Sequence, residues 1–205
     1  MALAAGCAAR PVLRAGAQPM RGAVPPDTTV VVLAPLVRID QLKPEAPVFD
    51  PPVSLDALSA SLAGAARAAA TAAAARVVDC SAAPGATWAP ICTALAADAG
   101  ALARGVVPPT GRAGLATLGA DAASTAVLAT LLVVKLGPGG SYNSFTGQIT
   151  SPTSSSVLSA ALLSAPANAT LWNNDVLLRS VPRPTDAGYR DALGALFDGA
   201  PDPGS

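Results

Sequence analysis

The 205-residue chain contains no histidine, and only 13% of its residues are charged. Without histidine it lacks the usual general base and the commonest protein ligand of zinc and haem. Carboxylates, lysine and cysteine remain available, but the composition argues against a hydrolase or a metalloenzyme. We expect a protein that is not an enzyme, with no catalytic residue, metal or cofactor.

A net charge of one sign is also missing, because 13 basic residues balance 13 acidic ones. This balance, without any basic cluster, argues against nucleic acid as a partner. No run reaches the 18 or so apolar residues of a membrane span. The apolar stretch from Ala126 is interrupted by Lys135, and the alanine run around Ala72 lies between Arg67 and Arg76. We therefore expect any membrane contact to come from a lipid anchor.

Aromatic residues make up 3% of the chain, so each should matter individually in a core of small side chains. We interpret three of them as structural anchors: Trp172, Phe145 and Phe197.

Apolar runs and turn residues predict one αβ domain with a mixed sheet and flanking helices. Thr28–Ile39 is expected to be a central strand that bends or loses pairing at Pro35, since proline has no donor. A helix from Ser54, a short strand Arg76–Cys80 and a helix from Pro90 follow. Four β-type runs are predicted to form an antiparallel meander before a last helix at Thr185–Phe197: Thr125–Leu136, Ser141–Thr150, Val157–Ser164 and Thr170–Ser180. The expected order is β-α-β-α-β-β-β-β-α.

The chain opens with LAAGC, from Leu3 to Cys7. This run resembles the lipobox of bacterial lipoproteins, in which the cysteine is acylated, and it makes Cys7 a candidate lipid attachment site, modified with palmitate. Ala4 departs from the motif, which prefers leucine at that position. A signal peptide needs a basic region and 7–15 apolar residues, whereas six residues precede Cys7. We therefore expect Met1 to be an internal start or a trimmed end; the alternative is an ordinary alanine-rich start.

The segment after Cys7 contains four prolines and shows no apolar periodicity. Such a composition predicts an extended tether. We divide the chain into a lipobox-like start and Pro-rich tether at 1–27, one αβ domain at 28–201 and a disordered tail at 202–205.

Cys80 and Cys92 lie at a strand end and in the first turn of the next helix. They can form a disulfide, worth about 2–3 kcal/mol on the loop-entropy model, or remain two buried thiols. A catalytic thiol would need a base beside it.

The element order is similar to that of the anticodon-binding-like domain of the curli-secretion lipoprotein family. The N-terminal domain of the Tol-system translocation protein and exopolysaccharide-export lipoproteins share it. The resemblance is carried by VVVLAPL (Val30–Leu36) and by the strand pair Val157–Arg179, where Leu171 and Trp172 match the family's Leu-Trp opening. The turn departs from the family, which commonly has a glycine where this chain has Asn168 and Ala169.

This resemblance implies a periplasm-facing, lipid-anchored accessory protein of an envelope export or secretion system. It would lie at the outer membrane and act through contacts with envelope proteins, with a homo-oligomeric ring as one form. The alternative is a soluble periplasmic or cytoplasmic domain that binds a small ligand in a pocket over the sheet, with weak enzymatic activity as one option. Polar side chains converging beneath Trp172 would favour that alternative.

Overall fold

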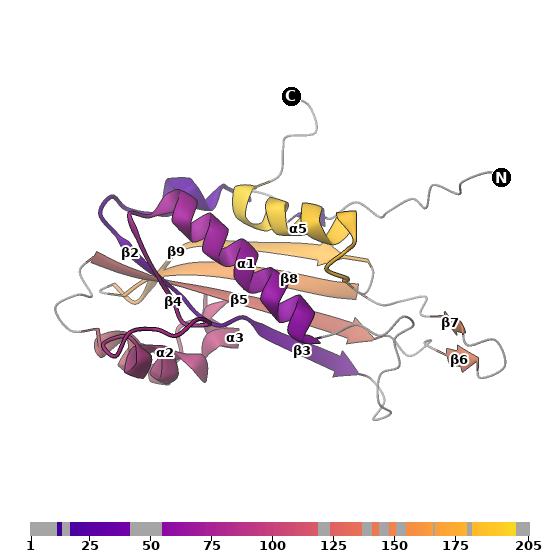
Figure 1. Ribbon diagram of the computed structural model, residues 1–205, viewed down its shortest axis with the longest axis horizontal. Helices are drawn as coiled ribbons and strands as arrows, with labels where there is room; N and C mark the ends of the chain where they lie inside the picture. The colour runs from indigo at the N-terminus through magenta and orange to yellow at the C-terminus, as the bar shows by residue number, and fades with distance from the viewer. Residues whose placement is uncertain are drawn as a thin grey trace.

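The structure is a computed structural model that describes residues 12–13, 17–41, 55–118, 124–136, 141–143, 148–150, 155–165, 167–179 and 182–199. Cys7, Phe145 and the predicted tail at 202–205 lie outside these residues. The prediction of one mixed-sheet αβ fold is confirmed (Figure 1).

The main sheet has seven strands in the order β1-β9-β8-β5-β2-β4, and β3 pairs with β5. Parallel pairing joins β2 to β4 and to β5, and β3 to β5. Antiparallel pairing joins β5 to β8, β8 to β9 and β9 to β1. The bounds of the strands are β1 Val12–Leu13, β2 Thr29–Val32, β3 Leu36–Gln41, β4 Arg76–Asp79, β5 Thr125–Leu136, β8 Ser155–Ser164 and β9 Ala169–Leu178.

The predicted opening strand is divided at proline, as expected. β2 pairs with the first part of β5 and β3 with the last part, so both follow the same neighbour on either side of Pro35. Proline removes one ladder donor, which interrupts the strand without changing its course. β2 lies between β4 and β5 and is buried at Val30, Val31 and Val32. This agrees with the prediction of a central strand.

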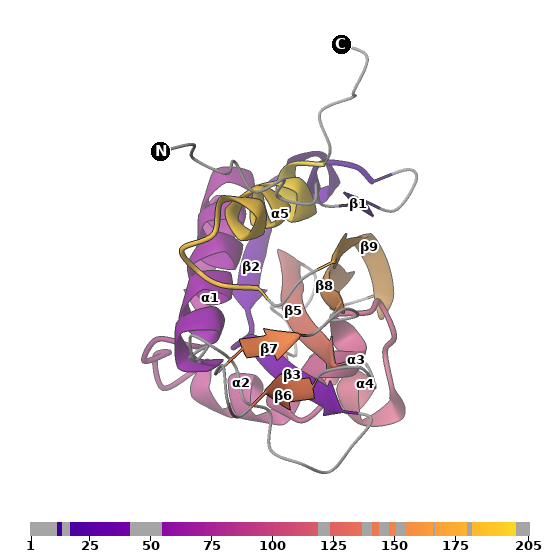
Figure 2. The ribbon, with the colours of Figure 1, turned by 90° about the vertical axis from the view of Figure 1, so that its right-hand side faces the viewer.

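Helices cover both faces of the sheet (Figures 1 and 2). On one face, α1 and α5 pack with the 3₁₀ helix η1 over a core that includes Leu58, Leu62 and Phe197. On the other face, α2, α3 and α4 enclose a second core around Leu95 and Leu102. The bounds of these helices are η1 Met20–Ala23, α1 Leu55–Ala73, α2 Ala89–Ala96, α3 Ala99–Leu102, α4 Pro109–Ala116 and α5 Ala187–Asp198.

The predicted four-strand meander is wrong in its second member. The residues Ser141–Thr150 form two short strands, β6 (Ser141–Asn143) and β7 (Gln148–Thr150), which pair only with each other among the described residues. β5 instead pairs directly with β8, from Ala126 to Lys135. A strand buried on both faces needs an equally apolar neighbour, and β8 supplies one where the polar 141–150 segment does not.

Some of the described residues before the predicted boundary at residue 27 pack on the domain. Met20 in η1 is 1% exposed and belongs to the core beneath α1 and α5. The prolines do not prevent this packing, since an irregular segment can bury one apolar side chain without forming a long helix or strand. Among the described residues before 28, the folded unit therefore includes 12–13 in the sheet and Met20 in the core.

Candidate functional site

The N-terminal segment follows the outer edge of β9. We call the described residues 12–13 and 17–23 the strap. Val12 lies opposite Leu177 and Leu13 opposite Val176, in antiparallel register. Further along, the backbone carbonyl of Gln18 accepts hydrogen bonds from Trp172 and Asn174, so the strap runs along β9 from its last residues toward its first. Figure 2 shows β1 next to β9.

Two side chains of β9 hold the strap. The Trp172 indole Nε1 donates to the Gln18 carbonyl at 2.7 Å, and Asn174 Nδ2 donates to the same oxygen at 3.0 Å. Asn174 Nδ2 also donates to the Leu196 carbonyl of α5 at 2.9 Å. Asn174 is buried, and a buried amide without partners would be costly. The Asn174 amide therefore joins β9 to both α5 and the strap.

Trp172 lies over an aromatic ring in the core. The ring stacks on Phe197 with centroids 6.3 Å apart, and both rings are buried in the same core. The polar groups beside Trp172 are bonded to backbone carbonyls of the chain itself. They make a structural contact and not a ligand site of the kind that the alternative interpretation needs.

A glycine allows the strap to cross the end of α5. Gly199 has a φ of +76°, and a Cβ at this position would lie 3.3 Å from the Pro19 nitrogen and 3.4 Å from the Gln18 carbonyl carbon. Any other residue would be strained in this left-handed conformation and crowded by the strap.

Cys80 and Cys92 are joined by a disulfide, with Cα atoms 5.5 Å apart. The bond ties the end of β4 to the first turn of α2. The Cys80 backbone N–H also donates to the Val32 carbonyl at 2.8 Å, which continues the ladder beyond β4. The sequence left open a disulfide or two buried thiols, and the structure has the disulfide.

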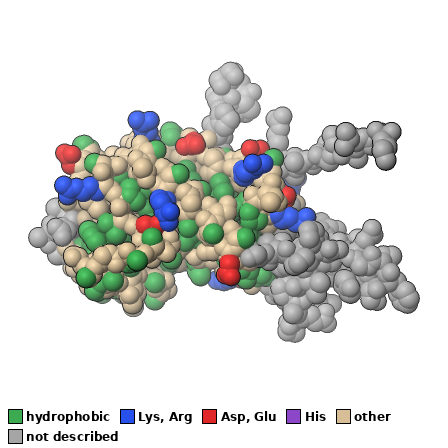
Figure 3. Space-filling model, viewed as in Figure 1, with side chains coloured by type: hydrophobic (Ala, Val, Ile, Leu, Met, Phe, Trp, Pro, Cys, Tyr) green, Lys and Arg blue, Asp and Glu red, His purple; other side chains and the backbone are tan. Residues whose placement is uncertain are grey.

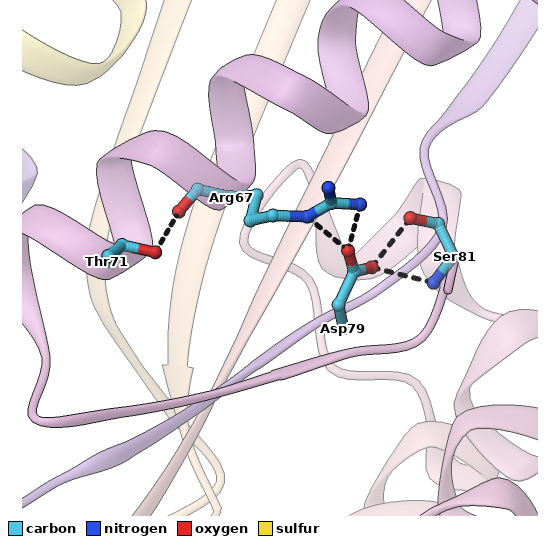
Figure 4. A network of polar contacts seen from close by, with 4 residues as sticks. All are labelled: Arg67, Thr71, Asp79 and Ser81. Carbon is cyan, nitrogen blue, oxygen red and sulfur yellow. Dashed lines mark hydrogen bonds and ion pairs between the residues drawn. The ribbon is translucent and has the colours of Figure 1, made fainter. Parts of the chain in front are cut away.

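A network of polar contacts joins α1 to β4 and the residue Ser81 that follows it (Figure 4). The Asp79 carboxylate accepts from the Arg67 guanidinium, and from the Ser81 backbone N–H at 2.8 Å and hydroxyl at 2.6 Å. Partial burial raises the pKa of Asp79, but the bonds from Ser81 and the Arg67 charge outweigh it and hold the pKa below its usual value. Asp79 is thus a stable carboxylate and a poor proton donor or acceptor near neutral pH.

Tyr189 is the other perturbed group. Burial raises its pKa to about 12, and the Ser61 hydroxyl of α1, which lies near but outside hydrogen-bond geometry, offsets part of this effect. Its own hydroxyl oxygen meets no partner with hydrogen-bond geometry among the described residues. It lies in the core beneath α5, away from solvent.

Within the described residues no group of three or more acidic, cysteine or histidine side chains is placed to hold a metal ion. A search of the same residues finds no helix with both the length and the apolar character of a membrane span. On the face shown in Figure 3, basic and acidic side chains are scattered among apolar and polar ones, without a large area of one sign.

Among the described residues, β3 forms an open edge of the sheet. In the described part of the chain β3 pairs with β5 alone, and its other side has no strand. Leu36 on this strand is 42% exposed, and Arg38 forms an exposed ion pair with Asp40 at 2.8 Å. An unpaired strand edge is a template for adding a strand from another chain. This edge is therefore the candidate protein-binding site.

Comparison with known proteins gives a likeness of fold. No family model matches the chain, and no curated protein matches it by sequence. The solved structure of lipoprotein GNA1162 from Neisseria meningitidis is 20% identical, with a TM-score of 0.40, covering 82% of this chain and 92% of its own. A PelC dodecamer from Paraburkholderia phytofirmans is 10% identical, with a TM-score of 0.34, covering 91% and 92%. A variant PelC dodecamer in a second crystal form is 12% identical, with a TM-score of 0.38, covering 93% and 99%.

Sequence reasoning found the cysteines and Trp172 but missed the strap and its acceptor, Gln18. One signal pointed to it: a tryptophan and an asparagine two residues apart in a buried strand both need hydrogen-bond partners. The sequence does not say which carbonyl provides them.

Proposed function

We propose that the chain is a lipid-anchored, periplasm-facing accessory protein of an envelope export or secretion system, which binds other proteins and performs no catalysis. The disulfide between Cys80 and Cys92 carries the proposal. Disulfides persist in oxidising compartments such as the periplasm. Of the three cysteines in the chain, two are thereby paired, which leaves Cys7 of the lipobox-like run as the thiol to be acylated.

The partner would bind at the open edge of β3. Strand addition there needs no pocket, since the backbone supplies the hydrogen bonds and exposed side chains such as Leu36 supply selectivity. The proposed lipid anchor and ring follow the names of the fold neighbours, which are a lipoprotein and two dodecamers. A second copy of the chain is thus one partner of this edge.

Metabolic labelling tests the anchor. The chain, joined from Leu3 onward to a donor lipoprotein signal peptide, is expressed in a bacterial host with radiolabelled palmitate. We expect label in the parent chain and in a Cys80→Ala/Cys92→Ala variant, and no label in Cys7→Ser. Label retained in Cys7→Ser, or absent from the parent, would refute the lipid anchor.

Sedimentation of the purified chain tests the edge. Leu36→Lys is expected to weaken self-association, whereas Leu171→Lys on β9, at a matched exposure of 38% against 42%, is expected to leave it unchanged. A parent chain that sediments as a monomer at all concentrations would refute the ring, and equal effects of the two variants would refute the choice of edge.

A further inference from the structure

We propose that the end of the sheet where β5 finishes and β8 begins faces the lipid bilayer, because the strap fixes the domain relative to its anchor. This inference rests on the proposed lipid anchor at Cys7. It replaces a loosely tethered domain, free to rotate, with one whose near end stays within reach of the anchor.

The chain between the anchor and its first contact with the sheet is short. Four residues lie between Cys7 and Val12, which pairs with Leu177. The five steps from Cys7 to Val12 span at most about 17 Å. A tether free up to Thr28 would instead span about 70 Å, enough to allow any orientation. The paired strap therefore shortens the connection to less than the length of the sheet.

That contact lies near one end of the sheet. Leu177 pairs with Val157 of β8, which pairs with Val133 of β5. Val133 is three residues from the end of β5 at Leu136 and eight from its start at Thr125. At about 3.3 Å per residue these are about 10 Å and about 26 Å. The anchor's reach covers the near end of the sheet and falls short of the far end.

The connection that leaves the sheet at the near end is uncharged. Between Lys135 and Asp175 the chain has no charged residue. The strands β6 and β7 of this connection lie beyond the end of β5 (Figure 1). Charged side chains are the most costly to bring into a bilayer, so a connection without them suits a position close to the lipid.

The partner is thus a lipid surface, contacted by the near end of the sheet. The far end, where the Thr170 hydroxyl donates to the Gly105 carbonyl at 3.0 Å, points away from the bilayer. Val106 beside it is 56% exposed and marks that end.

The experiment couples the purified full chain through Cys7 to a maleimide-headgroup lipid in phosphatidylcholine–phosphatidylethanolamine vesicles. Chemical coupling makes the result independent of whether cells acylate Cys7, so failure here is distinct from failure of the palmitate experiment. A photoreactive benzoylphenylalanine replaces either Lys135 or Val106, both exposed and at opposite ends of the sheet. After irradiation, lipid adducts are measured by mass spectrometry.

We expect adducts from position 135 and few or none from position 106. A Trp172→Phe/Asn174→Leu variant, which loses both donors to Gln18, should lose the difference between the two positions. Thr170→Val, which loses one hydrogen bond elsewhere on β9, should keep it. Equal adducts from both positions in the parent chain, or none from position 135, would overturn the proposal.

Discussion

Replacing Met20 by alanine measures directly whether the strap belongs to the folded unit. Met20 is 1% exposed and lies in one core cluster with Leu58 of α1 and Leu196 of α5. Truncating a fully buried methionine costs about 2–5 kcal/mol, from lost burial and the cavity that remains. Methionine is flexible and η1 is short, so neighbours can partly close the gap. We expect the lower half of the range, about 2–3 kcal/mol.

Urea unfolding followed by far-UV circular dichroism under oxidising conditions is the assay. The midpoint should fall while the urea dependence of the unfolding free energy stays the same, since the surface exposed on unfolding hardly changes. Gln18→Ala is the matched control: its side chain is exposed, and only its backbone carbonyl is used. It should change stability by less than about 0.5 kcal/mol. If Met20→Ala were equally neutral, residues 17–23 would not pack as described and the argument from the strap would fail.

Three further predictions concern the core and its supports. Reducing the Cys80–Cys92 disulfide, which spans 12 residues, should lower the unfolding free energy by about 3 kcal/mol; the same midpoint with and without reductant would contradict this. Tyr189 keeps its proton to a higher pH folded than unfolded, so the parent chain should lose stability as pH rises from 10 toward 12; Tyr189→Phe should remove this loss in alkaline melts, and an unchanged slope would show that another group causes it. Asp79 has a lowered folded pKa, so its contribution is present above the unfolded value of 3.8 and is lost as pH falls through the folded pKa. Asp79→Asn should flatten acid melts in that window, whereas Arg67→Gln should flatten them only in part because Ser81 still donates; equal flattening would argue against the role of Ser81.

The main strands could be predicted from the sequence because burial on both faces leaves an unmistakable pattern. The run Thr125–Leu136 matches β5 residue for residue, and Pro35 divides the first strand as proline chemistry requires. Asn168 takes a positive φ of 48° in the β8–β9 turn, as its tolerance of left-handed geometry allows.

Pairing was less predictable than strand formation. The polar alternation at Ser141–Thr150 is typical of a strand with one wet face, but it does not say which strand is its neighbour. β5 and β8 pair because both are apolar over about ten residues, and this comparison between distant segments decides the topology.

The strap could not be predicted because its stability comes from tertiary contacts. One buried methionine and one backbone carbonyl hold a segment whose composition is that of a linker. Likewise, the spacing of Cys80 and Cys92 permitted a bond, and the approach of β4 to α2 in the fold brings them together.

Hydrogen exchange of the strap tests the central claim most directly, since both the anchor geometry and the orientation depend on it. In the full chain, amides in a peptide spanning residues 12–23 should exchange far more slowly than an unstructured peptide, and the Trp172→Phe/Asn174→Leu variant should lose this protection. Exchange of the strap in the parent chain at the unstructured rate would contradict the account.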